Sequence, residues 1–353
     1  MQPLKRISQH MPHNQQGLTL IELMLSLSIG LIVSASAFEL FTHSIRSRQI
    51  QMSVAEVQDA ALFSLASVNQ QIAHANLGAA TPMQQQTAWT GVVFTGSIKS
   101  GLNNESGQPL LSGNLRGIQG VDAQLLTRSS VGPSNVTDAK LSDQLTIQYQ
   151  APFDGFDCEG DALKQGDMVI ERFFTRTDRQ RAANETKDLA IVLACDAGRY
   201  QLPDGLDADA LTSNQISLVG FGDNGVIVMN RVDYLNVKLG VMLANGLAYM
   251  PIDTYLTTAA SSNASLSYVY QAPIVAIQIG VVSRGNSALV ASDSSQSRFV
   301  INGSERIIKQ QTPSYIRRSL NSVVYLRNNQ LRSSQLKSSQ VVNSQLSKSQ
   351  GTR

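Results

Sequence analysis

Apolar and polar residues follow three different patterns along the chain, and each pattern predicts a different kind of segment. An unbroken apolar run occupies residues 18–38, directly after the mainly polar residues 1–17. Apolar residues then recur every three or four positions up to about residue 77, which is typical of an amphipathic helix. From residue 79 to 330 short apolar runs alternate with Gly, Asn, Asp and Pro clusters, which favours strands. The pattern predicts an α+β chain in which a long helix packs on an antiparallel β-sheet domain.

The helix is expected to run without interruption from Leu18 to about Leu77, because no proline lies between Pro12 and Pro82. At the rise of an α-helix this segment would be about 90 Å long. Its second half carries apolar residues at helical spacing, which predicts a face packed on the domain that follows. These residues are Val54, Val57, Ala61, Leu65, Val68 and Ile72.

The apolar run 18–38 is long enough to cross a bilayer, and Lys5 and Arg6 before it favour a cytoplasmic start. One interpretation is a cleaved secretory signal, since Ala35-Ser36-Ala37 offers a cleavage site that would leave Phe38 first. A second is a plain signal anchor. Neither explains Glu22, whose carboxylate costs about 2 to 3 kcal/mol near a bilayer centre.

The strand runs beyond residue 79 are expected to form an antiparallel domain. Asn224-Gly225 and Asn245-Gly246 each stand between apolar runs, so a tight hairpin is predicted at each pair. Residues 96–143 are rich in small polar residues and are expected to form long loops, and the Ser/Gln-rich residues 331–353 a disordered tail. The expected strands lie at 87–94, 144–150, 168–174, 189–195, 216–221, 226–230, 232–243, 247–252 and 274–283.

Composition and charge narrow the functional classes. The chain has 353 residues, of which 42% are hydrophobic and 15% charged, so it can bury a substantial core. The formal charge of +2 includes Lys5 and Arg6, and no basic surface is left to favour direct binding of nucleic acid. Cys158 and Cys195 are the two cysteines, and on an exported chain they are expected to form one disulfide. The alternative is two buried thiols.

Catalytic and metal-binding chemistry is not predicted. All four histidines precede the strand region, which argues against a histidine-based triad or zinc site within it. Two acidic clusters could supply calcium ligands, although neither has the spacing of an EF-hand and both are interpreted as solvated loops. The clusters are Asp154, Asp157, Glu159 and Asp161, and Asp204, Asp207 and Asp209. We therefore expect no enzyme, no cofactor and no metal.

The segment from Gly17 to Met24, GLTLIELM, resembles the prepilin peptidase recognition segment of type IV pilins and type II secretion pseudopilins. The resemblance implies cleavage between Gly17 and Leu18, methylation of the new N-terminus at Leu18, and an inter-subunit contact between Glu22 and a neighbour's terminal amine. Leu18 stands where phenylalanine or methionine is more usual. The implied organisation is a leader at 1–17, a helix at 18–78 that spans the membrane at 18–38, the β domain, and the tail.

Three later segments are similar to the PilW type of type IV pilus minor pilin, and the cysteine spacing also fits that family. They are Asp233–Val241, Ile274–Arg284 and Arg317–Asn328. This resemblance implies a subunit of a tip complex that primes pilus assembly, with twitching motility, adhesion or DNA uptake as outputs of the system. The implied partners are other minor pilins, the major pilin, the prepilin peptidase and the inner-membrane assembly platform.

The implied location is the inner membrane, with a periplasmic C-terminal domain, and the pilus tip or cell surface after assembly. Two other hypotheses stay open. One is a GspJ-like pseudopilin of type II secretion, built on the same helix. The other is a membrane-anchored periplasmic enzyme or binding protein, which would tolerate the loss of Glu22.

Overall fold

The computed structural model describes residues 17, 19–78, 89, 91–94, 114–115, 118–119, 121–181, 183, 185–202, 216–243, 245–261, 272–288, 297–309 and 314–327. The chain divides into two compact units, Met1–Gln51 and Met52–Arg353. Of the expected leader at 1–17, residues 1–16 lie outside the described residues, as do Leu18 and the expected tail at 331–353. The α+β class predicted from the sequence is confirmed, because a long N-terminal helix precedes antiparallel sheets.

The helix begins as α1 (Leu20–Asp59), continues through a π-helical turn η1 (Ala60–Ser64) and ends as α2 (Leu65–Ile72). It therefore ends about one turn before the predicted Leu77. The chain leaves the helix through Asn76 and Gly78, both of which have positive φ. A Cβ at Gly78 would lie 2.5 Å from the Gln150 side chain, so glycine is required by the close approach as well as by the backbone.

The predicted apolar stripe packs as expected within the second unit. Val57, Leu65, Val68 and Ile72 are buried and Val54 is half-buried. From Val57 to Leu65 an ideal α-helix would rotate about 80° beyond two full turns. The extra residue held by the π turn offsets much of that rotation, so the two side chains share a face. The sequence pattern gave no sign of this turn.

The larger sheet has the order β1-β4-β7-β8-β10, with β3 also paired to β4, and every pairing is antiparallel. Alternate side chains of its long strands enter the main core beside the helix. Its strands are β1 (Gly91–Val92), β3 (Arg128–Gly132), β4 (Ser142–Gln150), β7 (Met168–Thr177), β8 (Ile191–Tyr200) and β10 (Val226–Met229).

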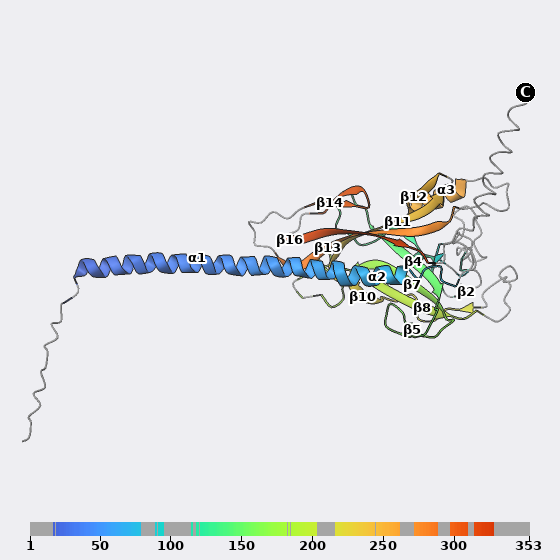
Figure 1. Ribbon diagram of the computed structural model, residues 1–353, viewed down its shortest axis with the longest axis horizontal. Helices are drawn as coiled ribbons and strands as arrows, with labels where there is room; N and C mark the ends of the chain where they lie inside the picture. The colour runs from blue at the N-terminus through green and yellow to red at the C-terminus, as the bar shows by residue number, and fades with distance from the viewer. Residues whose placement is uncertain are drawn as a thin grey trace, which may run out of the picture. The chain divides into compact units, whose positions relative to one another are not determined.

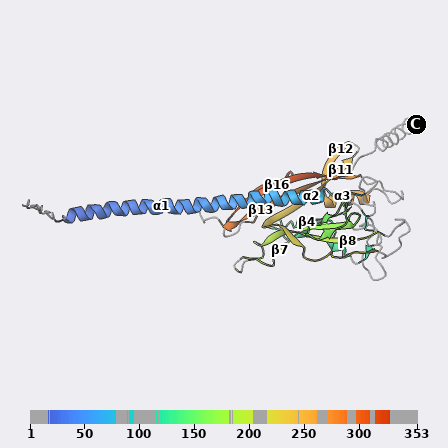
Figure 2. The same cartoon turned by 60° about the horizontal axis from the view of Figure 1, so that its bottom comes forward.

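The second sheet has the order β12-β11-β13-β16 and is also antiparallel. Figure 2 shows β11, β12 and β16 above β4, β7 and β8, and α2 lies beside β16 in both Figures 1 and 2. Ser322 of β16 donates a hydrogen bond to Asn69 of α2. The elements are β11 (Val232–Leu243), β12 (Gly246–Pro251), α3 (Ile252–Ser261), β13 (Ile274–Ala288) and β16 (Tyr315–Tyr325).

Short pairs of strands complete the described part of the second unit. The pair β2 and β9 is parallel, and the other two pairs are antiparallel. They are β2 (Ile118–Gln119) with β9 (Ile216–Ser217), β5 (Gly155–Phe156) with β6 (Ala162–Leu163), and β14 (Arg298–Ile301) with β15 (Ser304–Ile307), and a 3₁₀ turn η2 covers Ala123–Leu125.

One of the two predicted hairpins is confirmed and the other is wrong. At Asn245-Gly246 the chain reverses, and Leu243 of β11 pairs with Gly246 of β12. At Asn224-Gly225 it does not reverse, because Val219 and Val226 both lie antiparallel to β8. Gly225 has a positive φ and lies so close to β8 that a Cβ would clash with the Cys195 carbonyl. The glycine therefore serves a close backbone approach within an irregular edge strand rather than a hairpin.

The helix reaches the second sheet through its polar face as well as its apolar one. The Asn286 N–H of β13 donates to the Glu56 carboxylate over 2.7 Å. A Cβ at Gly285 would lie 2.4 Å from the Ser53 hydroxyl, which is fully buried. Since only glycine leaves room for Ser53, the end of β13 and the helix are held in direct contact.

Candidate functional site

Gly17 is exposed ahead of the helix, and nothing comes within 4 Å of the place where a Cβ would stand. A residue exposed in this way is accessible to an enzyme that must bind the chain at the cleaved bond. Leu18, the residue expected to become the methylated N-terminus, lies outside the described residues. Cleavage between Gly17 and Leu18 therefore stays a prediction.

Glu22 takes part in a capping box at the start of α1. Its Oε2 accepts hydrogen bonds from the Thr19 N–H and hydroxyl, both at 3.2 Å, and its own N–H donates to the Thr19 hydroxyl oxygen at 3.3 Å. The sequence Thr-x-x-Glu ahead of an apolar run is a signature of this arrangement. The signature is visible in the sequence, although Glu22 was predicted there only as an inter-subunit group.

These contacts change how Glu22 is interpreted. Even in a plain signal anchor the carboxylate has a local role, because it accepts from the Thr19 N–H, which the start of the helix leaves without a backbone partner. The presence of Glu22 alone thus does not separate a pilin from an anchored periplasmic protein. Its pairing with a neighbour's terminal amine stays a prediction.

The apolar segment of α1 is exposed throughout the first unit, including Leu20, Ile21 and Phe38. Within the part of the chain that the structure describes, this is the one helix that is long and apolar enough to span a membrane. Three of its serines do not oppose insertion, because Ser26, Ser28 and Ser36 donate to backbone carbonyls three or four residues earlier.

The predicted disulfide between Cys158 and Cys195 is confirmed, and it closes a sequence separation of 37 residues with 6.1 Å between the Cα atoms. It fastens the loop after β5 to the middle of β8. Glu171 on the neighbouring strand β7 lies against the bridge, where its Oε1 accepts from the Cys158 N–H and the Tyr149 hydroxyl. Its Oε2 is buried without a hydrogen-bond partner.

Burial raises the pKa of Glu171 to about 8, with smaller contributions from Asp157 and Glu159. The folded chain therefore holds this proton more tightly than the unfolded chain, and stability should fall as the pH rises from about 4.5 to about 8. Glu171 should lower the free energy of unfolding by up to about 1.4 kcal/mol for each pH unit in this range, and we expect Glu171→Gln to abolish that contribution. Urea unfolding of both proteins at pH 5, 7 and 9 measures it; parallel pH profiles would contradict this assignment.

The acidic residues around the disulfide already hold the loop together. Asp157 Oδ1 accepts from the N–H groups of Glu159 and Asp161, while Glu159 accepts from Ala197. Asp154 pairs with Lys164 at the surface. Loop-stabilising carboxylates therefore account for these contacts. The second cluster, Asp204, Asp207 and Asp209, lies outside the described residues.

His74 contacts the strand region, although its position in the sequence placed it before that region. Its ring lies 5.3 Å from that of Tyr149, and burial, with a smaller effect of Arg327, lowers its pKa. His43 is exposed on α1 one turn from Glu39.

The three segments that resemble PilW-type minor pilins meet at one buried charge cluster. Asp233 of β11 accepts from Arg317 of β16 and from Asn135, and Arg284 of β13 lies 3.8 Å from the same carboxylate. Arg284 also pairs with Glu185 at 3.3 Å and stacks on Tyr315. Asp233, Arg284 and Arg317 thus join three strands of the second sheet at one end, which sequence reasoning did not foresee.

Comparison with protein families finds the prokaryotic N-terminal methylation motif at residues 12–38. No curated protein matched the chain, and no solved structure did. The motif covers the proposed cleavage bond, Glu22 and the apolar segment, and it supports membrane anchoring. Together with a long N-terminal helix followed by antiparallel sheets, it supports the assignment of this chain to the type IV pilin-like proteins, pilins and pseudopilins taken together.

Proposed function

We propose that this chain is a noncatalytic minor pilin of a type IV pilus, and that it belongs to a tip complex that primes assembly. The observation that carries the proposal is the methylation motif at residues 12–38, placed at the start of a membrane-length helix. The PilW-like segments, which meet around Asp233, favour the minor pilin over other members of the class.

In this proposal the prepilin peptidase removes residues 1–17, and α1 anchors the chain in the inner membrane with its β-sheets in the periplasm. The helix then leaves the bilayer and enters the filament with other minor pilins, the major pilin and the assembly platform as partners. The new amine at Leu18 follows the removed Gly17 and precedes the Thr19–Glu22 capping box. A neighbour's amine would add a charge-assisted bond to a carboxylate that already accepts two hydrogen bonds.

Replacement of Glu22 by valine tests the proposal. We expect processing to continue and piliation to be lost, because the inter-subunit ion pair in an apolar setting needs both members. The measurements are immunoblotting for the processed chain and electron microscopy of surface pili. Glu39→Val is the matched control, since Glu39 is also exposed on α1 and lies beyond the methylation motif at residues 12–38.

Normal piliation in the Glu22→Val strain would contradict the proposed role of Glu22. Deletion of the whole gene separates the two pilin hypotheses. A minor pilin is required for surface pili, whereas a GspJ-like pseudopilin is required for release of exported proteins and leaves pili intact. If both outputs were unchanged, the anchored periplasmic enzyme or binding protein would be favoured.

A further inference from the structure

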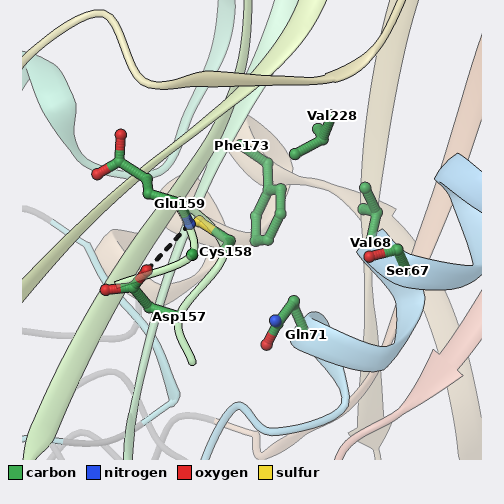
Figure 3. Close-up of a pocket in the computed structure, with 9 residues that line it drawn as sticks. Ser67, Val68, Gln71, Asp157, Cys158, Glu159, Phe173 and Val228 are labelled. Carbon is green, nitrogen blue, oxygen red and sulfur yellow. Dashed lines mark hydrogen bonds between the residues drawn. The ribbon is translucent and has the colours of Figure 1, made fainter. Parts of the chain in front are cut away.

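A cavity of about 260 Å³ opens between α2 and the loop that carries Cys158. In Figure 3 Cys158 lies across this cavity from Val68 and Gln71 of α2. Its disulfide partner Cys195 is fully buried in the main core, whereas Cys158 is half-buried and lines the cavity. A reagent that enters from solvent therefore reaches Cys158 first.

Glu171 places a carboxyl group beside the disulfide. One of its carboxyl oxygens lies within 4.8 Å of both sulfur atoms. The residue is fully buried, and its Oε1 accepts from the Cys158 N–H at 3.0 Å and from the Tyr149 hydroxyl at 3.2 Å. Its Oε2 has no hydrogen-bond partner among the described residues. Since Oε1 already accepts two hydrogen bonds, the proton of the neutral acid belongs on Oε2.

The surroundings of Glu171 keep it protonated near neutral pH. Burial raises its pKa to about 8, Asp157 and Glu159 of the loop add to the rise, and the two hydrogen bonds oppose it. The other titratable side chains nearby are Arg172 and Asp196, which pair with each other, and His74, whose ring packs on Tyr149. A glutamine in this place could accept the same two hydrogen bonds. What only the acid offers is a proton that it can give up.

Reductive opening of the disulfide requires such a proton. A thiolate that attacks Cys158 expels the sulfur of Cys195. That sulfur would leave as an anion within the apolar core, where burial disfavours its charge. An acid held next to it removes this obstacle, because it can protonate the sulfur while the bond breaks.

We propose that the Cys158–Cys195 bridge is a site of thiol–disulfide exchange with an external dithiol, and that Glu171 is the proton donor to the departing Cys195 sulfur. One thiol of the dithiol gives its proton to solvent and attacks Cys158 Sγ as a thiolate. The bond between the two cysteines breaks, and Cys195 becomes a thiol with the proton from Glu171 Oε2.

The second thiol of the dithiol completes the exchange. Its sulfur attacks the mixed disulfide, and Cys158 leaves as a thiol with the proton of that second thiol. The dithiol is thereby oxidised to a disulfide, both cysteines are reduced, and Glu171 regains a proton from solvent. Reduction would remove the covalent link between β8 and the loop after β5 without breaking a strand pairing. This inference does not depend on the pilin function.

The first experiment locates the attacked sulfur. The folded full chain in nonionic detergent is treated with 2-mercaptoethanol, quenched with iodoacetamide and analysed by peptide mass spectrometry. We expect the mercaptoethanol adduct on Cys158 and the carbamidomethyl group on Cys195. The reverse placement would overturn the proposal.

The second experiment measures the rate of reduction by dithiothreitol, divided by the fraction of the reagent present as thiolate. We expect Glu171→Gln to lower this rate roughly a hundredfold, the lower end of the effect of a positioned acid. Asp161→Asn is the matched control, because it removes an exposed carboxyl group from the same loop and should leave the rate unchanged. In urea that unfolds the chain, all three proteins should react at the same rate.

The pH dependence of the rate distinguishes a proton donor from a structural residue. The rate for the native chain should decrease as the pH passes about 8, where Glu171 loses its proton, and the rate for Glu171→Gln should stay level. Reduction through unfolding would give the opposite slope, because stability falls as the pH rises toward the raised pKa.

Equal rates for the native chain and Glu171→Gln in the folded state would overturn the proposal. So would a native rate that stays level or rises between pH 7 and 9. If Glu171→Gln fails to fold, the pH profile of the native chain decides the question by itself.

Discussion

Replacing Gly17 with valine is expected to abolish processing, so that the chain accumulates with its leader attached. The structure gives no folding reason for such a loss, because a Cβ at Gly17 meets nothing within 4 Å and the residue is exposed. The effect should therefore come from the peptidase, which must accommodate the residue before the cleaved bond. The measurement is the mass of the mature N-terminal peptide from membranes, with and without the prepilin peptidase.

The native chain should yield a methylated terminus at Leu18 that disappears when the peptidase is removed. Thr19→Val is an informative companion, since it removes the hydroxyl of the capping box without touching the cleaved bond. A terminus at Phe38 in the native chain would contradict the prediction and would favour an ordinary secretory signal instead.

The second large effect is expected at Asp233. Asp233→Asn leaves Arg317 and Arg284 buried next to a neutral side chain, and removal of one member of a buried ion pair costs about 3 to 5 kcal/mol. That is a large share of the stability of most domains, about 5 to 15 kcal/mol. Urea unfolding of the full chain in detergent, followed by near-ultraviolet circular dichroism, measures the change.

Two further variants make the result specific. Glu305→Gln breaks an exposed pair with Arg298 and should change stability by about 1 kcal/mol or less. If Asp233→Asn fails to fold, the double variant Asp233→Asn/Arg317→Gln should recover part of the loss, because it removes the uncompensated charge as well. A cost for Asp233→Asn no larger than that of Glu305→Gln would show that the cluster contributes little.

Local chemistry explains how much of this fold the sequence could predict. The expected strands 232–243 and 274–283 appear as β11 and within β13, because their apolar runs are long and bounded by turn residues. The hairpin predicted at Asn224-Gly225 is wrong, because Asn-Gly permits a positive φ without specifying which strand lies nearby. Glycine is needed at position 225 because a Cβ there would clash with the Cys195 carbonyl. This is a long-range contact that no local pattern encodes.

The features of the candidate site likewise divide into those that the sequence predicts and those that it does not. The methylation motif, the membrane-length helix and the disulfide could be predicted because each depends on residue identity and spacing. The cluster around Asp233 could not, because it brings together residues far apart in the chain. The capping box of Thr19 and Glu22 was visible in the sequence and was missed because a more specific role for Glu22 was considered first.

The contact of Ser53 and Glu56 with the end of β13 has a mechanical consequence. A pulling force carried along the helix would pass to the sheets through Gly285 and Asn286. That strand is an interior one, with β11 bonded along one edge and β16 along the other. The load would therefore act as shear on two ladders of hydrogen bonds, which must break together. A strand at a free edge could instead be peeled away one bond at a time.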